Sequence, residues 1–407
     1  MTTEAHVAPD SAPSPAPGRW RALSLLAVAM LLAMTTWFSA SAVVPQLRDA
    51  WGLSSAAASL LTIAVQLGFV AGAVTSAFLT LADVVPPRRV MLFGATGAAL
   101  VNALLLVAAG PAVAIPLRFL TGAFLAGVYP PGMKAMSTWF RAGRGLALGV
   151  MVGALTAGSA VPHLVNALGG LDWKVVIVTT SVLTVVGGLI AEFAVGDGPH
   201  RFPTAPFRPR QVLDVIRNRR WRLASYGYFG HMWELYAMWA WIVVFLSTSF
   251  ERAGTANAGT WGPMGAFAAI GIGALGCIWG GALADRRGRE WLTAVAMVIS
   301  GASSLVVGLT WGGPPWLVVT VVLVWGVAVV ADSAQFSTIV TEVSDQRYVG
   351  TALTLQLAIG FSLTVVTIWL IPVLEEAVSW RWAFVVLAPG PALGTAAMLR
   401  LRSLRGA

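Results

Sequence analysis

Two side chains that can exchange protons lie inside an apolar stretch of the chain. Residues Ala224–Phe250 are long enough to cross a bilayer as one helix, and they hold His231 and Glu234 near their middle. An ionisable side chain at that depth is costly when it faces lipid, so we expect both to face a cavity or a partner. At the helical period they share a face with three further residues, Gly227, Met238 and Trp241. This face predicts the wall of a polar pathway; the alternative is a buried Glu–His hydrogen bond that only locks helix packing.

The composition of the chain indicates a membrane protein. Of its 407 residues, 57% are hydrophobic and 11% are charged, whereas ordinary globular domains are about a quarter charged. The net charge of +9 does not indicate nucleic-acid binding, because the basic residues lie between apolar stretches and not in one patch. The single cysteine, Cys277, can form no internal disulfide. We therefore predict an all-α polytopic membrane protein.

Clusters of charged residues, Pro and Gly divide the chain into apolar segments, each long enough to span a membrane. They form two sets of six: Ala22–Val44, Ser55–Leu81, Val90–Ala108, Ala112–Trp139, Gly145–Leu168 and Val175–Val195, then Ala224–Phe250, Trp261–Leu283, Trp291–Leu309, Trp316–Val340, Thr351–Ile371 and Trp382–Leu399. We number them spans one to twelve.

Five regions follow from this division. We expect a disordered cytoplasmic tail at 1–18, a six-helix bundle at 19–195 and a basic linker at 196–222 that ends in a short amphipathic helix. A second six-helix bundle follows at 223–400, and a short cytoplasmic tail at 401–407.

Lysine and arginine are unequally divided between the two sides of the expected membrane. With the N-terminus inside, 20 of them fall on the cytoplasmic side and four outside. This bias places both termini in the cytoplasm. Arg outnumbers Lys 24 to 2, which we attribute to a GC-rich bacterial genome, so the predicted location is the bacterial inner (plasma) membrane.

The two halves repeat. Leu81-Ala82-Asp83 after span two recurs as Leu283-Ala284-Asp285 after span eight, 202 residues later. Similar echoes precede spans five and eleven and spans six and twelve, so the pattern indicates a six-helix unit duplicated in parallel.

The loop after span eight carries the most specific motif. Gly281-Ala282-Leu283-Ala284-Asp285-Arg286-Arg287-Gly288-Arg289 resembles the loop motif G-x-L-a-D-r-x-G-r of the major facilitator superfamily. The resemblance implies two six-helix bundles, a cavity lined by spans one, four, seven and ten, and secondary transport by alternating access. It also implies that this loop latches neighbouring helices in one conformation. The copy after span two keeps Asp83 and the basic end, with Arg88, but loses both glycines.

Span four offers two basic candidates. Arg118-Phe119-Leu120-Thr121-Gly122 resembles the family element R-x-x-x-G, which implies that Arg118 serves proton coupling or substrate contact. The alternative is a structural arginine that caps backbone carbonyls. Lys134 on span four and Asp332 on span ten are expected to meet across the halves as a cytoplasmic gate.

Further side chains are candidates for contact with a solute. Gln335 and Gln356 are polar groups inside the membrane. Trp37 lies 202 residues before Trp239, so the two are expected to face each other as hydrophobic cavity walls or as aromatic packing.

No enzymatic motif is present, neither HExxH nor GxSxG nor a phosphate loop, and ATP-driven transport is excluded for this chain alone. We expect no cofactor and no metal, a lipid bilayer and a small solute as partners, and a monomer. Glu234, assisted by His231, is the predicted proton-responsive group. The first function predicted is proton-coupled transport of a small organic or inorganic anion, drawn by Arg118 and Lys134. The second is proton-coupled efflux of a hydrophobic or cationic drug, and the third is a non-transporting membrane sensor.

Overall fold

A computed structural model describes residues 16–79, 81–140, 143–169, 172–200, 209–345, 347 and 349–404. The expectation for most of the N-terminal tail and that for the side chain of Asp83 lie outside the described part of the chain. Every regular element of the described residues is a helix. The first half contains α1 (Arg19–Ala33), η1 (Met34–Thr36), η2 (Ser41–Val43), α2 (Val44–Trp51), α3 (Ser55–Phe78), α4 (Leu81–Val84), α5 (Pro87–Ala103), η3 (Leu104–Val107), α6 (Pro111–Leu125), α7 (Tyr129–Ser137), α8 (Arg144–Leu168) and α9 (Trp173–Phe193).

Two short helices follow before the second half begins, η4 (Pro209–Gln211) and α10 (Val212–Arg217). The second half contains α11 (Arg219–Arg252), α12 (Ala258–Arg287), α13 (Arg289–Val306), η5 (Val307–Thr310), α14 (Pro315–Ala331), α15 (Ser333–Val343), α16 (Val349–Val378), α17 (Trp380–Ala383), η6 (Phe384–Leu387) and α18 (Pro389–Ser403). Within the described residues, 12 helical segments are long and apolar enough to cross a membrane, which confirms the predicted twelve spans.

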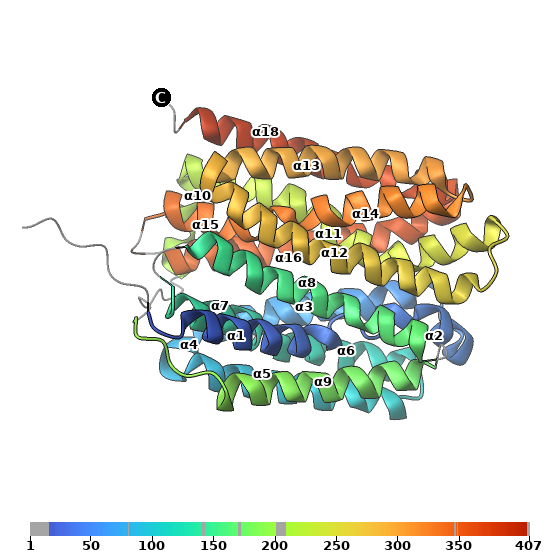
Figure 1. Ribbon diagram of the computed structural model, residues 1–407, viewed down its shortest axis with the longest axis horizontal. Coiled ribbons are helices and arrows are strands. Elements are labelled where there is room, and N and C mark those ends of the chain that lie inside the picture. The colour runs from blue at the N-terminus through green and yellow to red at the C-terminus, as the bar shows by residue number, and fades with distance from the viewer. Residues whose placement is uncertain are drawn as a thin grey trace, which may run out of the picture.

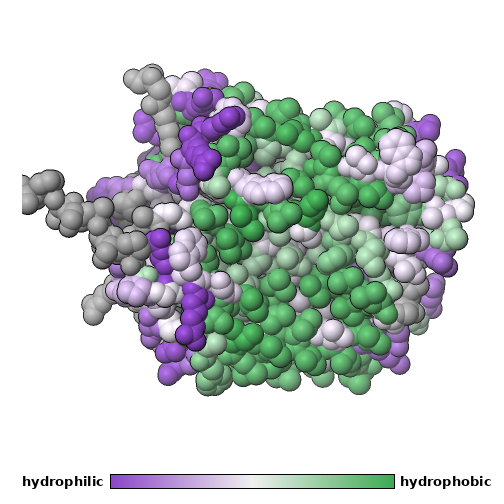
Figure 2. Space-filling view, viewed as in Figure 1, coloured by the Kyte–Doolittle hydropathy of each residue, from purple (hydrophilic) through white to green (hydrophobic). Residues whose placement is uncertain are grey.

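The helices form two bundles that lie side by side, with α8 and α12 adjacent at the seam between them (Figure 1). The start of α1 and the end of α18 lie at the same end of the molecule. An apolar belt covers the visible face, and hydrophilic residues gather at both ends of it (Figure 2). This distribution fits a helical protein whose middle is immersed in lipid.

Spans one, four and ten, which contribute to the site described below, are broken, whereas span seven is long and continuous. Span one changes from α1 to short 3₁₀ turns between Met34 and Val43, span four breaks before Tyr129, and span ten breaks at Asp332. By contrast, α11 runs unbroken for 34 residues. Pro130 and Pro131 follow the break in span four, as expected for residues that lack a backbone N–H. Breaks in a membrane helix leave backbone groups that other side chains must satisfy.

The seam between the bundles depends on glycine. A methyl group added at Gly149 of α8 would lie 2.6 Å from the backbone oxygen of Cys277 on α12, so the two helices touch backbone to backbone. A methyl group added at Gly145 would lie 2.3 Å from the carboxylate of Asp285. Small residues thus allow the two halves to approach closely at the end that carries the termini. On the other side of the molecule, α3 packs against α16.

Candidate functional site

Glu234 is buried and bonded to two neutral donors. Its side chain is 1% exposed. Ser300 Oγ on α13 donates a hydrogen bond to Oε2 at 2.5 Å, and Trp325 Nε1 on α14 donates to Oε1 at 2.7 Å. No basic side chain is among these partners, so the carboxylate of Glu234 has no counter-ion among the described residues. A buried carboxyl group in such surroundings is a candidate for proton exchange.

His231 contacts the break in span ten and not Glu234. Its Nδ1 lies 2.9 Å from Asp332 Oδ1, and its Nε2 lies 2.8 Å from Ser333 Oγ. The first distance suits an ion pair, although the ring N–H does not point straight at the oxygen. Because both side chains are almost fully buried, this contact ties the unbroken helix α11 to the turn between α14 and α15.

The face of α11 that holds these two residues packs within its own bundle. Gly227 lies against Met398 of α18, and Trp241 Nε1 donates to the backbone oxygen of Ile368 on α16 at 2.9 Å. The sequence predicted that this face lines a pathway, whereas its contacts in the structure are with α13, α14, α16 and α18 of the same half. The helical period shows which side chains share a face, but it does not show which neighbour that face will meet.

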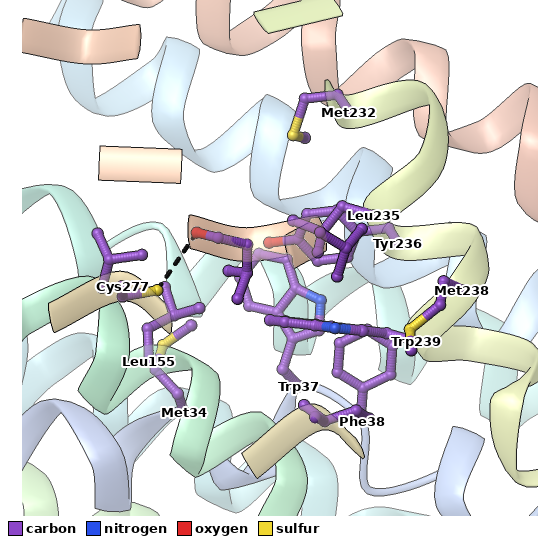
Figure 3. Close-up of a cluster of buried hydrophobic side chains, with 14 of the residues drawn as sticks. Met34, Trp37, Phe38, Leu155, Met232, Leu235, Tyr236, Met238, Trp239 and Cys277 are labelled. Carbon is purple, nitrogen blue, oxygen red and sulfur yellow. Dashed lines mark hydrogen bonds between the residues drawn. The ribbon is translucent and has the colours of Figure 1, made fainter. Parts of the chain in front are cut away.

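Another face of α11 meets the first half through aromatic rings. We define the central aromatic cluster as Trp37, Phe38, Phe69, Tyr236, Trp239 and Phe361. The ring centroids of Trp37 and Tyr236 lie 5.8 Å apart, and those of Phe69 and Phe361 lie 4.7 Å apart, so rings from both halves are in contact. Figure 3 shows Trp37 and Trp239 together in this buried region. The cluster joins the broken span one to the unbroken span seven.

Arg118 donates hydrogen bonds to backbone oxygens at the break in span one. The guanidinium is fully buried and donates to the backbone oxygens of Thr36, Trp37 and Leu61. Its Nη1 also donates to Ser39 Oγ and to Asn102 Oδ1, each at 3.1 Å. All three nitrogens therefore have partners, and the contacts match the carbonyl-capping alternative from the sequence.

The predicted gate residues have separate surroundings. Lys134 is partly buried in the last turn of α7. The acidic residue Asp332 contacts His231, so the Lys134–Asp332 pair is not among the described contacts of this conformation, and the gate stays a prediction. Gln335 lies beyond the break, where its Oε1 accepts from Arg289 Nη1 at 2.8 Å. Gln356 is buried on α16, and its Nε2 has no hydrogen-bond partner.

The loop between α12 and α13 contacts two other helices. Gly288 has a φ of 93°, a backbone conformation that favours glycine, which explains the sharp reversal predicted there. The carboxylate of Asp285 lies against Gly145 at the start of α8. Its Oδ1 lies 3.6 Å from Arg289 Nη1. Arg289 Nε also donates to Glu342 Oε1 on α15 at 2.9 Å.

The remaining residues of the two loop motifs differ in their contacts. Gly281 packs against the backbone of Gly145, whereas Arg286 is exposed. In the first half, Arg88 forms an ion pair with Asp197, with 3.2 Å between Nε and Oδ1.

Several residues of the site were missed by sequence reasoning. The partners of Glu234, Ser300 and Trp325, lie on spans nine and ten and carry no charge, although an indole in an aliphatic stretch was a usable signal. Phe38 and Tyr236 were not among the predicted site residues, because the contact between the halves to which they belong is not revealed by a local pattern. Among the described residues, no group of three or more His, Cys, Asp or Glu is placed to hold a metal ion.

Comparisons with known proteins agree with this architecture. The family model described as "Major Facilitator Superfamily" matches residues 26–366. Among solved structures, the chain is similar to one described as "Crystal Structure of A Bacterial Homolog to Human Lysosomal Transporter, Spinster, in Inward-facing And Occupied Conformation". The TM-score is 0.69 at 16% sequence identity, over 95% of this chain and 97% of the other, which shows a shared fold. A search of curated proteins finds no match.

Proposed function

The chain belongs to the major facilitator superfamily, and we propose that it is a secondary transporter of a hydrophobic aromatic solute, coupled to protons. One observation carries the solute class: the two halves meet at the centre through aromatic rings. Alternating access separates such halves on one side at a time around a central site. Rocking would therefore expose the rings to an apolar solute that replaces their contacts with one another.

The contacts of Arg118 favour this solute over a small anion. The anion prediction relied in part on a guanidinium that attracts the solute. All three nitrogens of Arg118 are bonded to the protein, including to backbone oxygens of span one and of α3. Redirecting those donors to an anion would leave buried carbonyl groups unsatisfied, at a cost of about 1–3 kcal/mol each.

Two buried acidic groups support proton coupling. Glu234 is bonded to neutral donors on α13 and α14, and Asp332 contacts His231 at the break in span ten. Both acids lie in the second half, on helices that adjoin the seam. A proton bound at Glu234 would change the charge of the bundle core, so protonation and helix movement are linked there.

The orientation in the membrane follows from charge. The start of α1 and the end of α18 lie at one end of the molecule. By the sequence, 20 of the 26 Lys and Arg residues fall in segments expected on the side of the termini. We propose that this end faces the cytoplasm of a bacterial cell.

A thermal-shift screen of the purified protein tests the solute class. Small inorganic and organic anions are compared with rigid aromatic compounds at equal concentration. We expect the aromatic compounds to raise the melting temperature. Stabilisation by anions alone would contradict the proposal.

A further inference from the structure

Two indole N–H groups in the central aromatic cluster have no hydrogen-bond partner among the residues that the structure describes. Trp37 and Trp239 are each 1% exposed, and neither Nε1 has a hydrogen-bond partner in the structure. Buried tryptophan usually finds a partner for its N–H. Trp241 and Trp325, on the same helix and on a neighbouring one, both do so, at 2.9 Å and 2.7 Å. A buried donor left without a partner costs about 1–3 kcal/mol, so this arrangement needs an explanation.

A buried amide lies one helical turn from the same cluster. Gln66 on α3 is fully buried, and neither atom of its amide has a partner. Phe69, three residues later on α3, packs its ring 4.9 Å from that of Trp37. Elsewhere in the cluster, the ring centroids of Phe38 and Trp239 lie 5.8 Å apart. The central aromatic cluster therefore combines apolar ring faces with two unsatisfied indole N–H groups, and an unsatisfied amide lies one helical turn away on α3.

The chemistry of these atoms indicates the solute. An indole N–H can only donate, so it needs an acceptor. The cluster has no charged member, and the carboxylate of Glu234 on the neighbouring face is bonded within its own bundle. We propose that the solute is an uncharged aromatic compound with a hydrogen-bond acceptor, such as a carbonyl oxygen, and that Trp37 and Trp239 donate to it.

This inference rests on the proposed function, because it assumes that an aromatic solute binds between the halves. It goes further by giving the solute a polar atom and by naming the two residues that select for it. A cation bound by ring faces is the competing chemistry. An ordered water is the other competitor, and it would satisfy both donors without selecting any ligand.

Three rigid tricyclic probes distinguish these cases: fluorenone, which has a carbonyl group, fluorene, which lacks it, and N-methylacridinium, which is cationic. Equilibrium dialysis against the full-length protein in detergent gives each affinity. A neutral hydrogen bond corresponds to about a 2- to 10-fold change in affinity, so we expect fluorenone to bind more tightly than fluorene by about that factor. In the Trp37→Phe, Trp239→Phe double variant, the smaller rings change the apolar contact with both probes alike, so we expect the two affinities to become equal because only fluorenone loses a hydrogen bond.

Trp233→Phe is the control, because Trp233 Nε1 donates to the backbone oxygen of Val386 at 3.0 Å, outside the cluster. This variant should keep the wild-type preference for fluorenone. If the double variant fails to fold, the single variant Trp239→Phe replaces it in the experiment. This variant should reduce the preference for fluorenone over fluorene.

Equal binding of fluorenone and fluorene to the wild type would overturn the inference and leave the proposed function standing. A preference that persists in the tryptophan variants would overturn it as well. Tighter binding of N-methylacridinium would replace the acceptor-bearing solute by a cation. Failure of all three probes to bind would contradict the proposed function itself.

Discussion

His231 Nδ1 lies 2.9 Å from Asp332 Oδ1, at the point where span ten breaks. The contact joins an unbroken helix to a broken one inside the same bundle. The helix α11 packs directly against α14 and α15, so a change in this contact would move α11 relative to the two parts of span ten. The predictions below follow from this and from the other buried contacts.

Removal of the Asp332 carboxylate should destabilise the second bundle. In Asp332→Ala, His231 loses the buried carboxylate that lies 2.9 Å from its Nδ1, and removal of one member of a buried contact of this kind is destabilising. We expect a melting temperature several degrees below that of the wild type, measured by thermal unfolding in detergent. Asp49→Ala is the control, because Asp49 is exposed. Equal melting temperatures for the two variants would show that the His231 contact does not stabilise the fold.

Glu234→Gln should separate proton coupling from solute movement. The amide can keep hydrogen bonds to Ser300 and Trp325 after local adjustment, but it binds no proton. We expect proteoliposomes with this variant to lose solute accumulation driven by a proton gradient and to retain solute counterflow. Glu376→Gln, at an exposed position near the end of α16, should behave as the wild type. Full accumulation by Glu234→Gln would remove Glu234 from the coupling mechanism.

Arg118→Lys should show whether the guanidinium is structural. Lysine keeps the charge but cannot reach Thr36, Trp37 and Leu61 together with a planar fork of donors. At least one buried carbonyl then loses its donor, so we expect destabilisation of about 1–3 kcal/mol or more. Thermal unfolding measures this, with the exposed Arg400→Lys as control. An unchanged melting temperature together with lost transport would instead indicate a role in coupling or substrate contact.

Cys277 should report the opening of the seam. It is the only cysteine of the chain, is 1% exposed, and lies on α12 where this helix contacts α8. In Gly149→Ala, the new methyl group would lie 2.6 Å from the backbone oxygen of Cys277, so the two helices must move apart. We expect a maleimide to modify Cys277 several times faster in this variant than in the wild type.

Gly271→Ala is the matched control for the labelling experiment. It lies on the same helix as Cys277, and its added methyl group meets no atom closer than 3.8 Å. Its labelling rate should equal that of the wild type. Slow labelling in Gly149→Ala as well would show that the seam does not need this close contact.

The sequence predicts much of the fold because lipid restricts what a chain can do. Apolar length, together with the charged residues, Pro and Gly between the apolar segments, located the twelve spans. The segment around Asp83 that recurs around Asp285, with two similar repeats, indicated the repeated halves. The break at Asp332 was not predicted, because a single polar residue inside an apolar span does not by itself end a helix.

The site was less predictable because its contacts are long-range. Helical periodicity grouped His231 with Glu234, but their partners lie apart in the sequence: Ser300 on α13, Trp325 on α14, and Asp332 and Ser333 at the break in span ten. Burial depth permitted two roles for Arg118, and only the position of the span-one carbonyls distinguishes them. Such partners depend on how helices pack, which local patterns do not encode.

The most direct test of the account is the pH inside proteoliposomes loaded with pyranine. An aromatic ligand that stabilises the protein and that empty liposomes exclude is added to the outside. We predict that its gradient changes the internal pH with the wild-type protein and does not do so with Glu234→Gln. If the ligand binds to the wild-type protein but the protein transports neither the ligand nor protons across the membrane, this would contradict the account and indicate a membrane sensor.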